Sequence, residues 1–315
     1  MSLVPELTRS SDDRVNWTVE VVRSKATCRT TVRYTFERIA VIYGKLYFDR
    51  SLGRATYSTL AHLWKQGFAA GSGLEVPEPL GFLEEASLLL LRRAADTPLN
   101  ELAVVGTLQE ALTAVRIAAR WLAKYHATEI PGLPVQSPCE RIEILSIADA
   151  RAKVAAEYPQ YSPLLIGMLH DLHGALSTHK SSSRLVATHG QFRPAHVFSD
   201  GKRATVIDIE KICLSDPAKD VARFVHSLKK ICIGEGHNPE RGDELSREFV
   251  AEYRMLSPSG LGNLAYFRAL LAFKAFAKLL KSHKVDEDER QALGEMYRLE
   301  FERTTHGNAF QGVAA

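Results

Sequence analysis

A short polar segment, residues 188–197, and an aspartate that follows it carry side chains common in enzyme active sites. The segment presents His189, Gln191, Arg193 and His196. Asp208 comes after the apolar pair Val206-Ile207, and an isolated buried carboxylate is costly, so we expect Asp208 to pair with a cation. With the imidazole of His196 it would offer the nitrogen and oxygen donors that Mg²⁺ or Mn²⁺ accepts. The sequence therefore indicates a possible divalent-cation site.

Each of these residues also has a purely structural interpretation. An aspartate after a strand often caps a turn, and a single histidine is often a hydrogen-bonded core or surface residue. Asp216 directly precedes Pro217 at the start of a predicted helix, which is typical of an N-cap. We therefore prefer the structural interpretation for Asp216, and the other residues need further evidence from their order along the chain.

The elements that must position these residues differ between the two ends of the chain. β-branched and aromatic runs predict an antiparallel sheet in residues 1–95, with one helix between the third and fourth of five strands. The expected strands cover residues 17–23, 31–36, 39–48, 80–84 and 87–92, and the expected helix covers residues 53–68.

Residues 96–315 are predicted to be mostly helical, because apolar residues recur every three or four positions. Between residues 185 and 209 the pattern changes to strand, polar turn and strand. Asp200-Gly201 lies there between two apolar runs, which is a strong hairpin signal. The fold class is therefore α+β. The expected helices cover residues 108–128, 142–158, 163–176, 216–231, 243–256, 261–281 and 286–301.

Composition argues against several classes of protein. The 315 residues include 40 Lys and Arg and 37 Asp and Glu, a net charge of +3, so a nucleic-acid-binding protein is not expected. No apolar run approaches the roughly 20 residues of a membrane span, and no membrane association is expected. The four cysteines show neither metal-site nor disulfide-scaffold spacing. A cytoplasmic location is therefore predicted.

The order of the polar residues resembles the catalytic core of the aminoglycoside phosphotransferase and choline kinase-like family. The family pattern is His-Gly-Asp-x-x-x-x-Asn, then a hydrophobic strand ending in Ile-Asp, then Gly-Asp-Pro-x-x-Asp at a helix start. This chain has His189-Gly190-Gln191-Phe192-Arg193-Pro194-Ala195-His196, Val206-Ile207-Asp208 and Ser215-Asp216-Pro217-Ala218-Lys219-Asp220. The resemblance implies a bilobal protein-kinase-like fold, with a nucleotide-binding lobe in residues 1–95. A helical lobe in residues 96–315 would carry the catalytic hairpin and the acceptor site.

The resemblance also implies roles for single residues. Lys45, on the third strand, would pair the α- and β-phosphates of ATP, although a lysine whose charged end reaches solvent is the structural alternative. Asp208 would be the principal ligand of Mg²⁺, or of Mn²⁺, and His196 stands at the second ligand position. The phosphate-covering turn would use Ser24, Lys25, Thr27 and Arg29. An exposed polar turn would have the same composition, so both interpretations of that turn stay open.

Three departures from the family pattern bear on activity, of which the mildest is His196 at the position of the family's metal-binding asparagine. Gln191 replaces the aspartate that acts as catalytic base, and a carboxamide orients a hydroxyl but does not accept its proton. Phosphoryl transfer depends mainly on positioning, so this change weakens the phosphotransferase hypothesis without removing it. Residues 54–68 contain no acid to pair with Lys45. Lys45 must then find another partner, such as Asp208, or be held by nucleotide phosphate alone.

Three functions remain open at this point. The first is an ATP-dependent phosphotransferase that acts on a hydroxyl of a small molecule, with Gln191 and Arg193 positioning the acceptor and His189 bracing the loop. The second is a pseudokinase that serves as a nucleotide-binding regulatory or scaffolding protein. The third is transfer of AMP by the same fold.

The acceptor site is expected between the hairpin and the C-terminal helices. Its candidate residues are Arg193, Asp220, Arg223, His226 and the segment 237–244. The same half of the chain is rich in basic residues, namely Lys219, Arg223, Lys229, Lys230, Lys274, Lys278, Lys281 and Lys284. A solvated basic face is one interpretation. If these residues face the site, an anionic or neutral acceptor is favoured over a cationic aminoglycoside.

Overall fold

The computed structural model describes residues 16–25, 29–37, 40–94, 97–135, 155–177, 184–280, 282 and 285–305. The chain divides into two compact units, and each is described by itself. Residues 1–98 and 196–210 form the first unit, and residues 99–195 and 211–315 form the second. The hairpin expected from the Asp200-Gly201 signal thus lies in the first unit, with the N-terminal strands. The boundary near residue 95 stays a prediction.

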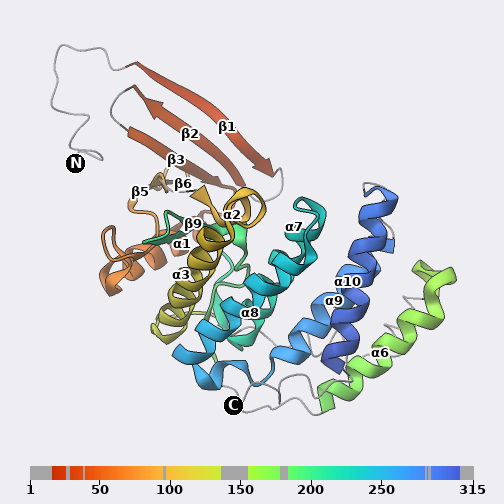
Figure 1. The fold of residues 1–315 in the computed structure, drawn as a ribbon. Helices are drawn as coiled ribbons and strands as arrows, with labels where there is room; N and C mark the ends of the chain where they lie inside the picture. The colour runs from red at the N-terminus through yellow and green to blue at the C-terminus, as the bar shows by residue number, and fades with distance from the viewer. Residues whose placement is uncertain are drawn as a thin grey trace. The chain divides into compact units, whose positions relative to one another are not determined.

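The first unit contains a five-stranded antiparallel sheet in the order β1-β2-β3-β6-β5 (Figure 1). Its strands are β1 (Trp17–Lys25), β2 (Arg29–Phe36), β3 (Ala40–Tyr47), β5 (Pro79–Leu83) and β6 (Leu88–Arg92). They confirm the five strands predicted from the alternation of β-branched residues. The register places Lys45 of β3 opposite Thr31 and Leu89 of the neighbouring strands, where it is only 8% exposed. A lysine this buried needs a charged partner.

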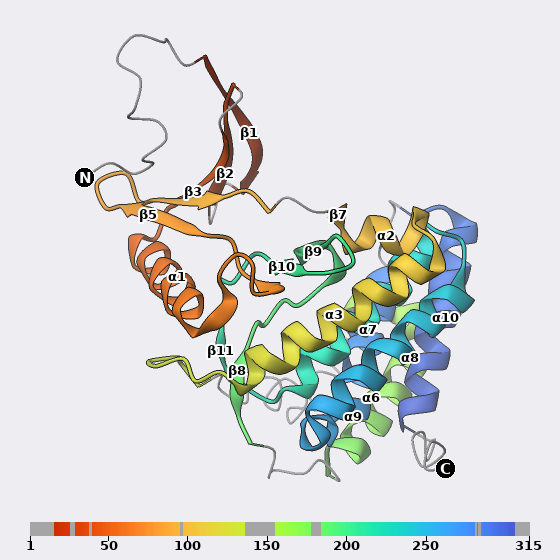
Figure 2. The same ribbon diagram turned by 60° about the vertical axis from the view of Figure 1, so that its left-hand side comes forward.

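One helix, α1 (Arg50–Leu63), packs on this sheet beside β5 (Figure 2). The carboxylate of Asp49 caps it by accepting hydrogen bonds from the backbone N–H and the hydroxyl of Ser51, at 2.9 and 2.6 Å. The helix therefore begins three residues before the predicted start at residue 53. It continues as a short π-helix, Trp64–Phe68, in which Gly67 adopts a φ of +84°.

The predicted hairpin is confirmed as β9 (Val197–Ser199) and β10 (Ala204–Val206). Its turn is fixed by the carboxylate of Asp200, which accepts hydrogen bonds from the backbone N–H groups of Lys202 and Arg203. The two strands form a second sheet with β4 (Leu74–Glu75) and β7 (Thr97–Pro98), in the order β4-β10-β9-β7. This sheet fixes the strand β10 that leads directly to Asp208.

The second unit is mostly helical, as the periodicity of residues 96–315 predicts. Its longer helices are α3 (Leu108–Ala127), α6 (Ser162–Ser177), α7 (Ala218–Gly234), α8 (Pro239–Leu256), α9 (Leu264–Leu280) and α10 (Glu287–Thr305). A short helix, α2 (Leu99–Val105), was not predicted, and the helix predicted at 142–158 lies largely outside the described residues. A strand pair, β8 (Val186–Thr188) and β11 (Cys213–Ser215), completes the unit. Among the helices described, none is long and apolar enough to cross a membrane.

Candidate functional site

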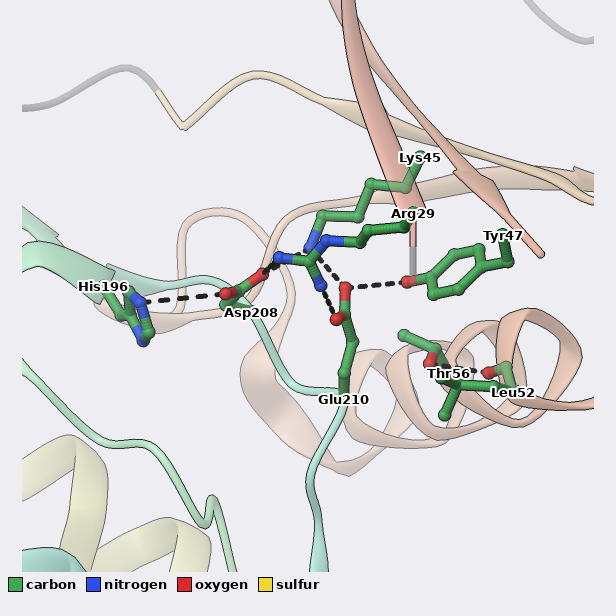
Figure 3. Close-up of polar contacts among 8 residues, drawn as sticks. All are labelled: Arg29, Lys45, Tyr47, Leu52, Thr56, His196, Asp208 and Glu210. Carbon is green, nitrogen blue, oxygen red and sulfur yellow. Dashed lines mark hydrogen bonds and ion pairs between the residues drawn. The ribbon is translucent and has the colours of Figure 1, made fainter. Parts of the chain in front are cut away.

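Charged side chains from β2, β3 and the segment after β10 converge in the first unit (Figure 3). The Lys45 ammonium Nζ lies 2.8 Å from Oδ1 of Asp208, and Nη2 of Arg29 lies 2.6 Å from the same oxygen. Two segments separated by more than 160 residues thus meet at one carboxylate. Lys45, Arg29 and Asp208, all singled out in the sequence, belong to one cluster.

Glu210 is the second carboxylate of this cluster and was not among the residues predicted from the sequence. Its Oε1 accepts hydrogen bonds from Nζ of Lys45 and from the hydroxyl of Tyr47, both at 2.8 Å, and its other oxygen pairs with Arg29. Glu210 is separated from Asp208 by Ile209, which is 2% exposed, and both carboxylates point toward the two cations (Figure 3). Glu210 therefore gives Lys45 the carboxylate partner that α1, which has no acidic residue, does not supply.

Burial and charge act in opposite directions on the titration of this cluster. Burial lowers the pKa of Lys45 more than the Asp208 carboxylate raises it, so the net shift is downward. Burial raises the pKa of Asp208, but the charges of Lys45 and Arg29 outweigh this effect and leave it well below its usual range. Burial raises the pKa of Tyr47 to about 12. Asp208 is therefore ionised at any pH at which the protein would work.

The backbone at Asp208 is unusual, because its φ of +70° lies in the left-handed region. Aspartate tolerates this region better than most residues, and such conformations cluster at functional sites. The conformation places Oδ2 of Asp208 3.7 Å from Nε2 of His196, which stands at the end of the 3₁₀ turn Pro194–His196. An oxygen and a nitrogen at this separation fit two positions around one Mg²⁺ or Mn²⁺ ion.

The remaining ligands of such an ion would have to come from outside this pair. No three His, Cys, Asp or Glu side chains of the described segments converge into a metal-binding group. Mg²⁺ usually binds one or two protein groups and takes its other ligands from water and substrate phosphates. The pair of Asp208 and His196 fits a metal site of that kind.

The predicted phosphate-covering turn is only partly described. Arg29 belongs to the charged cluster, whereas the Ser24 hydroxyl lies 3.1 Å from that of Thr30 across β1 and β2 and is exposed. Thr27 and the side chain of Lys25 lie outside the described residues. The structure therefore brings Arg29 to the cluster and places Ser24 in an exposed cross-strand pair.

In the second unit, the loop that begins at His189 is held by one buried carboxylate. The backbone N–H groups of His189 and Gly190 donate to the two oxygens of Asp220, at 2.6 and 3.0 Å, and Asp220 is fully buried. Nε2 of His126 lies 3.3 Å from Asp220, and Nδ1 of His126 lies 2.8 Å from the hydroxyl of Tyr253. Asp220, considered from the sequence as an acceptor residue, is instead the anchor of this loop.

Burial raises the pKa of Asp220, yet the hydrogen bond and charge of His126 and the donors of the loop bring it below its ordinary value. Asp220 therefore stays ionised and keeps accepting from the loop. His126 and Tyr253 were not found from the sequence because they lie on apolar helix faces that look like ordinary core.

Aromatic packing fixes the loop from its other side. Phe192 is fully buried, and its ring stacks on Trp121 at 5.8 Å and on Phe224 at 5.2 Å between centroids. Its neighbour Gln191 is half-buried and Arg193 is exposed. The backbone N–H of Gln191 donates to Nδ1 of His189 at 3.4 Å, a contact within the loop. The loop is thus fixed through its backbone and Phe192.

We expect Gly190→Ala to destabilise the second unit by about 3 kcal/mol or more. Gly190 adopts a φ of +74°, and an added Cβ would overlap the carbonyl oxygen of Lys211. Gly132→Ala is the matched control, because Gly132 has a φ of +73° but open space around it, so only backbone strain of about 1 kcal/mol is expected there. Urea unfolding of both variants measures the difference, and equal losses would contradict the predicted overlap.

Three of the acceptor candidates line one cavity of the second unit, namely Arg193, Arg223 and His226. The segment 237–244 contributes His237, Pro239 and Asp243 to a different cavity, between α7, α8 and α10. Asp216 lies one residue before the N-cap of α7, which is Pro217, so the predicted N-cap position is off by one residue, although Asp216 does bind the helix start. Its carboxylate accepts from the backbone N–H of Ala218 at the start of α7 and from the amide of Asn263.

The chain matches a known protein family. A model of the phosphotransferase enzyme family matches residues 53–254, more than half of the chain. A search of curated protein sequences found no match.

Solved structures of similar fold cover nearly the whole chain. A choline/ethanolamine kinase family protein from Mesorhizobium loti is 14% identical with a TM-score of 0.58, over 97% of this chain and 95% of that chain. A macrolide 2'-phosphotransferase from Brachybacterium faecium is 16% identical with a TM-score of 0.54, over 88% and 90%. A spectinomycin phosphotransferase, solved with ADP and spectinomycin, is 13% identical with a TM-score of 0.59, over 91% and 93%. These likenesses confirm the predicted protein-kinase-like α+β fold.

Proposed function

This chain belongs to the phosphotransferase enzyme family, and from that premise we propose that it transfers the terminal phosphoryl group of ATP to a hydroxyl of a small molecule. The observation that carries the proposal is the 2.8 Å contact between Nζ of Lys45 and Oδ1 of Asp208. It joins a strand lysine, suited to nucleotide phosphates, to a carboxylate suited to their metal ion. The nucleotide complex of the spectinomycin phosphotransferase, an enzyme of the same fold, supports the choice of nucleotide.

In this proposal the first unit holds the nucleotide. Lys45 and Arg29 bind its phosphates, and Ser24, Lys25 and Thr27 complete the phosphate-binding turn. Asp208 and His196 hold Mg²⁺ or Mn²⁺, which when bound neutralises charge on the phosphates. Because Lys45 and Arg29 also pair with Glu210, they keep a partner when Asp208 turns to the metal.

The second unit orients the acceptor. Gln191 and Arg193 would hold the acceptor hydroxyl, and His189 and Asp220 fix the loop that carries them. The acceptor oxygen forms the new bond to phosphorus as the bond to the departing ADP oxygen breaks. The hydroxyl proton passes to water, because the Gln191 carboxamide has no basicity. Positioning is then the main contribution of Gln191, as a loose transition state allows.

Nucleotide binding is tested by thermal denaturation. We expect millimolar Mg-ATP or Mg-ADP to raise the Tm of the wild-type protein, because a ligand bound only to the folded state stabilises it. Lys45→Ala should lose the shift, whereas Lys65→Ala, at an exposed position of the π-helix, should keep it. Absence of any shift in the wild type would remove the proposal. Mass spectrometry of products then distinguishes an added phosphoryl group from an added adenylyl group.

Gln191 itself favours one alternative, a nucleotide-binding pseudokinase, and substitution separates the two. For a working site we expect Gln191→Asp to change ATP turnover by less than about tenfold, because positioning dominates the reaction. We expect Gln191→Ala, which removes the orienting group, to lower turnover about tenfold or more. A general base contributes about 10²- to 10⁴-fold. If the wild type is inactive and Gln191→Asp raises ATP turnover by that factor, the wild-type protein is a pseudokinase.

A further inference from the structure

The cavity that contains Arg193, Arg223 and His226 is strongly basic. It has a volume of about 420 Å³, within the range of small-molecule sites. Of the described residues that line it, one is acidic, Glu289, and six are Lys or Arg. The six are Arg193, Lys219, Arg223, Lys230, Lys274 and Lys278. A cavity with this excess of positive charge has the electrostatics of an anion site.

The basic residues form two facing stripes rather than a scattered surface. Lys219, Arg223 and Lys230 recur at helical spacing along α7, and Lys274 and Lys278 do so along α9. The two helices are in contact, and α10 packs against α9 (Figure 1). The cations are therefore directed to a common space by the packing of three helices.

One cation of the cavity has a polar atom that the surrounding chain does not satisfy. Nε of Arg223 is buried, and within the described part of the protein it has no hydrogen-bond partner. A buried guanidinium nitrogen left without an acceptor is costly. Arg223 also lines the cavity, so an anion bound there would lie beside this guanidinium group.

The environment of His226 reports the same positive field. Burial is the main cause that lowers the pKa of His226 to about 4, and the charges of Lys230, Arg223 and Arg193 act in the same direction, against an opposing effect of Glu300. The imidazole stacks on the ring of Tyr297 at 5.3 Å. His226 is therefore neutral near pH 7 and does not add to the charge of the cavity.

Most of the remaining lining is apolar, although Ser227 and Ser282 also contribute to it. Phe267, Leu270 and Leu271 come from α9, and Leu293 and Tyr297 come from α10. Arg193, by contrast, belongs to the loop of Gln191, so the cavity reaches the segment that carries the proposed acceptor-orienting residues. A ligand with an anionic group and a hydrocarbon part matches both kinds of wall.

We propose that this cavity binds an acceptor that carries a carboxylate or phosphate group on an apolar body, and that Arg223 is its principal anion-binding residue. The statement that the ligand is the acceptor rests on the proposed phosphotransferase function. The binding of an anionic ligand in this cavity does not depend on that function. It assigns the acceptor to the anionic small molecules. It also explains why a cationic aminoglycoside would be repelled here.

The test uses four probes of similar size on the full chain at low salt. The anions are 4-hydroxyphenylacetate and phenyl phosphate, the neutral probe is 4-hydroxyphenylacetamide, and the cation is tyramine. We expect both anions to bind with a Kd at least about tenfold below that of the amide, and tyramine to bind weakest. The affinity of the anions should fall with added salt. The tighter of the two anions identifies carboxylate or phosphate as the natural group.

Substitutions locate the binding. Arg223→Gln should weaken phenyl phosphate about tenfold or more. Should Arg223→Gln fail to fold, the double variant Lys230→Gln/Lys278→Gln, at two exposed positions, should give a similar loss. Arg247→Gln, an exposed arginine of α8 outside the cavity, is the charge-matched control and should bind like the wild type. The NMR-measured pKa of His226 should rise when phenyl phosphate binds, because the anion offsets the neighbouring cations.

Several outcomes would overturn the inference. They are equal affinity for the anions and the amide, no anion binding at about 10 mM, or unchanged affinity in the cavity variants. The thermal shift with Mg-ADP is recorded on the same samples. Anion binding without a nucleotide shift would reject the proposed function and keep the anion site, and the reverse result would reject only the anion site.

Discussion

Replacing Asp208 with asparagine should lower kcat/KM for phosphoryl transfer at least about 1000-fold, a loss of about 4 kcal/mol of transition-state stabilisation. The substitution keeps the shape of the side chain but removes the charge that pairs with Lys45 and Arg29 and that would bind the proposed metal ion. Asparagine tolerates a φ of +70° about as well as aspartate does. The backbone is therefore expected to stay in place, and the loss is measured by steady-state kinetics over a range of Mg²⁺ concentrations.

The matched control for this prediction is Asp200→Asn in the turn of the same hairpin. The Asp200 carboxylate accepts two backbone N–H groups, and an asparagine oxygen accepts the same bonds, so kcat/KM should stay within about twofold. A turnover of Asp208→Asn close to the wild-type value would contradict the assignment of Asp208 to the metal.

The stability of Asp208→Asn should also depend on pH in a defined way. The pKa of Asp208 is lower in the folded protein than in the unfolded chain. Its stabilising contribution is therefore complete above the unfolded pKa of about 3.9 and is lost as the pH falls toward the folded value. The variant should lack this part of the acid-induced loss of stability.

Local pattern was sufficient to predict most of the fold. The five strands follow from β-branched and aromatic runs, and the hairpin follows from Asp200-Gly201 between two apolar segments. Helix ends were less accurate. The true start of α1 was indicated by the capping residue Asp49, which precedes the apolar periodicity used for the prediction. Strands β4 and β7 have two residues each and no periodicity, so their pairing with the hairpin depends on contacts distant in sequence.

The candidate site was predictable where its residues stand in a local order, and less so where partners are distant. Asp208 was identified from its place after a short apolar strand and Lys45 from the family resemblance, whereas the second partner of Lys45, Glu210, was missed two residues beyond Asp208. Its signal was available, since a second carboxylate beside a buried Ile209 is as costly to leave unpaired as the first. The link from Asp220 to His126 joins residues 94 positions apart, and no spacing rule predicts it.

Replacing Asp220, which anchors the loop that begins at His189, is expected to have the second large effect on stability and activity. We expect Asp220→Asn to lower stability by about 2–4 kcal/mol, because the amide group offers one acceptor oxygen to two backbone donors and turns an NH₂ toward the other. We also expect kcat to fall about 100-fold, since the loop that carries Gln191 and Arg193 loses its fixed position. The Kd of Mg-ADP should change less than about twofold, because Asp220 acts on the acceptor side of the reaction.

Comparison with a core variant distinguishes this role from simple destabilisation. Leu165→Ala in α6 removes a fully buried side chain and should cost a similar 2–5 kcal/mol or so, yet its kcat well below the Tm should match the wild type. The pKa of Asp220 is lowered by folding. The contribution of Asp220 to the free energy of unfolding is therefore lost only as the pH falls below about 3.9. Leu165→Ala keeps this acid-induced loss of stability, whereas Asp220→Asn should lack it. Equal loss of kcat in both variants would show that Asp220 supports the fold without positioning the loop. Loss of kcat confined to Asp220→Asn would establish the buried carboxylate as the group that holds Gln191 and Arg193 in position for phosphoryl transfer.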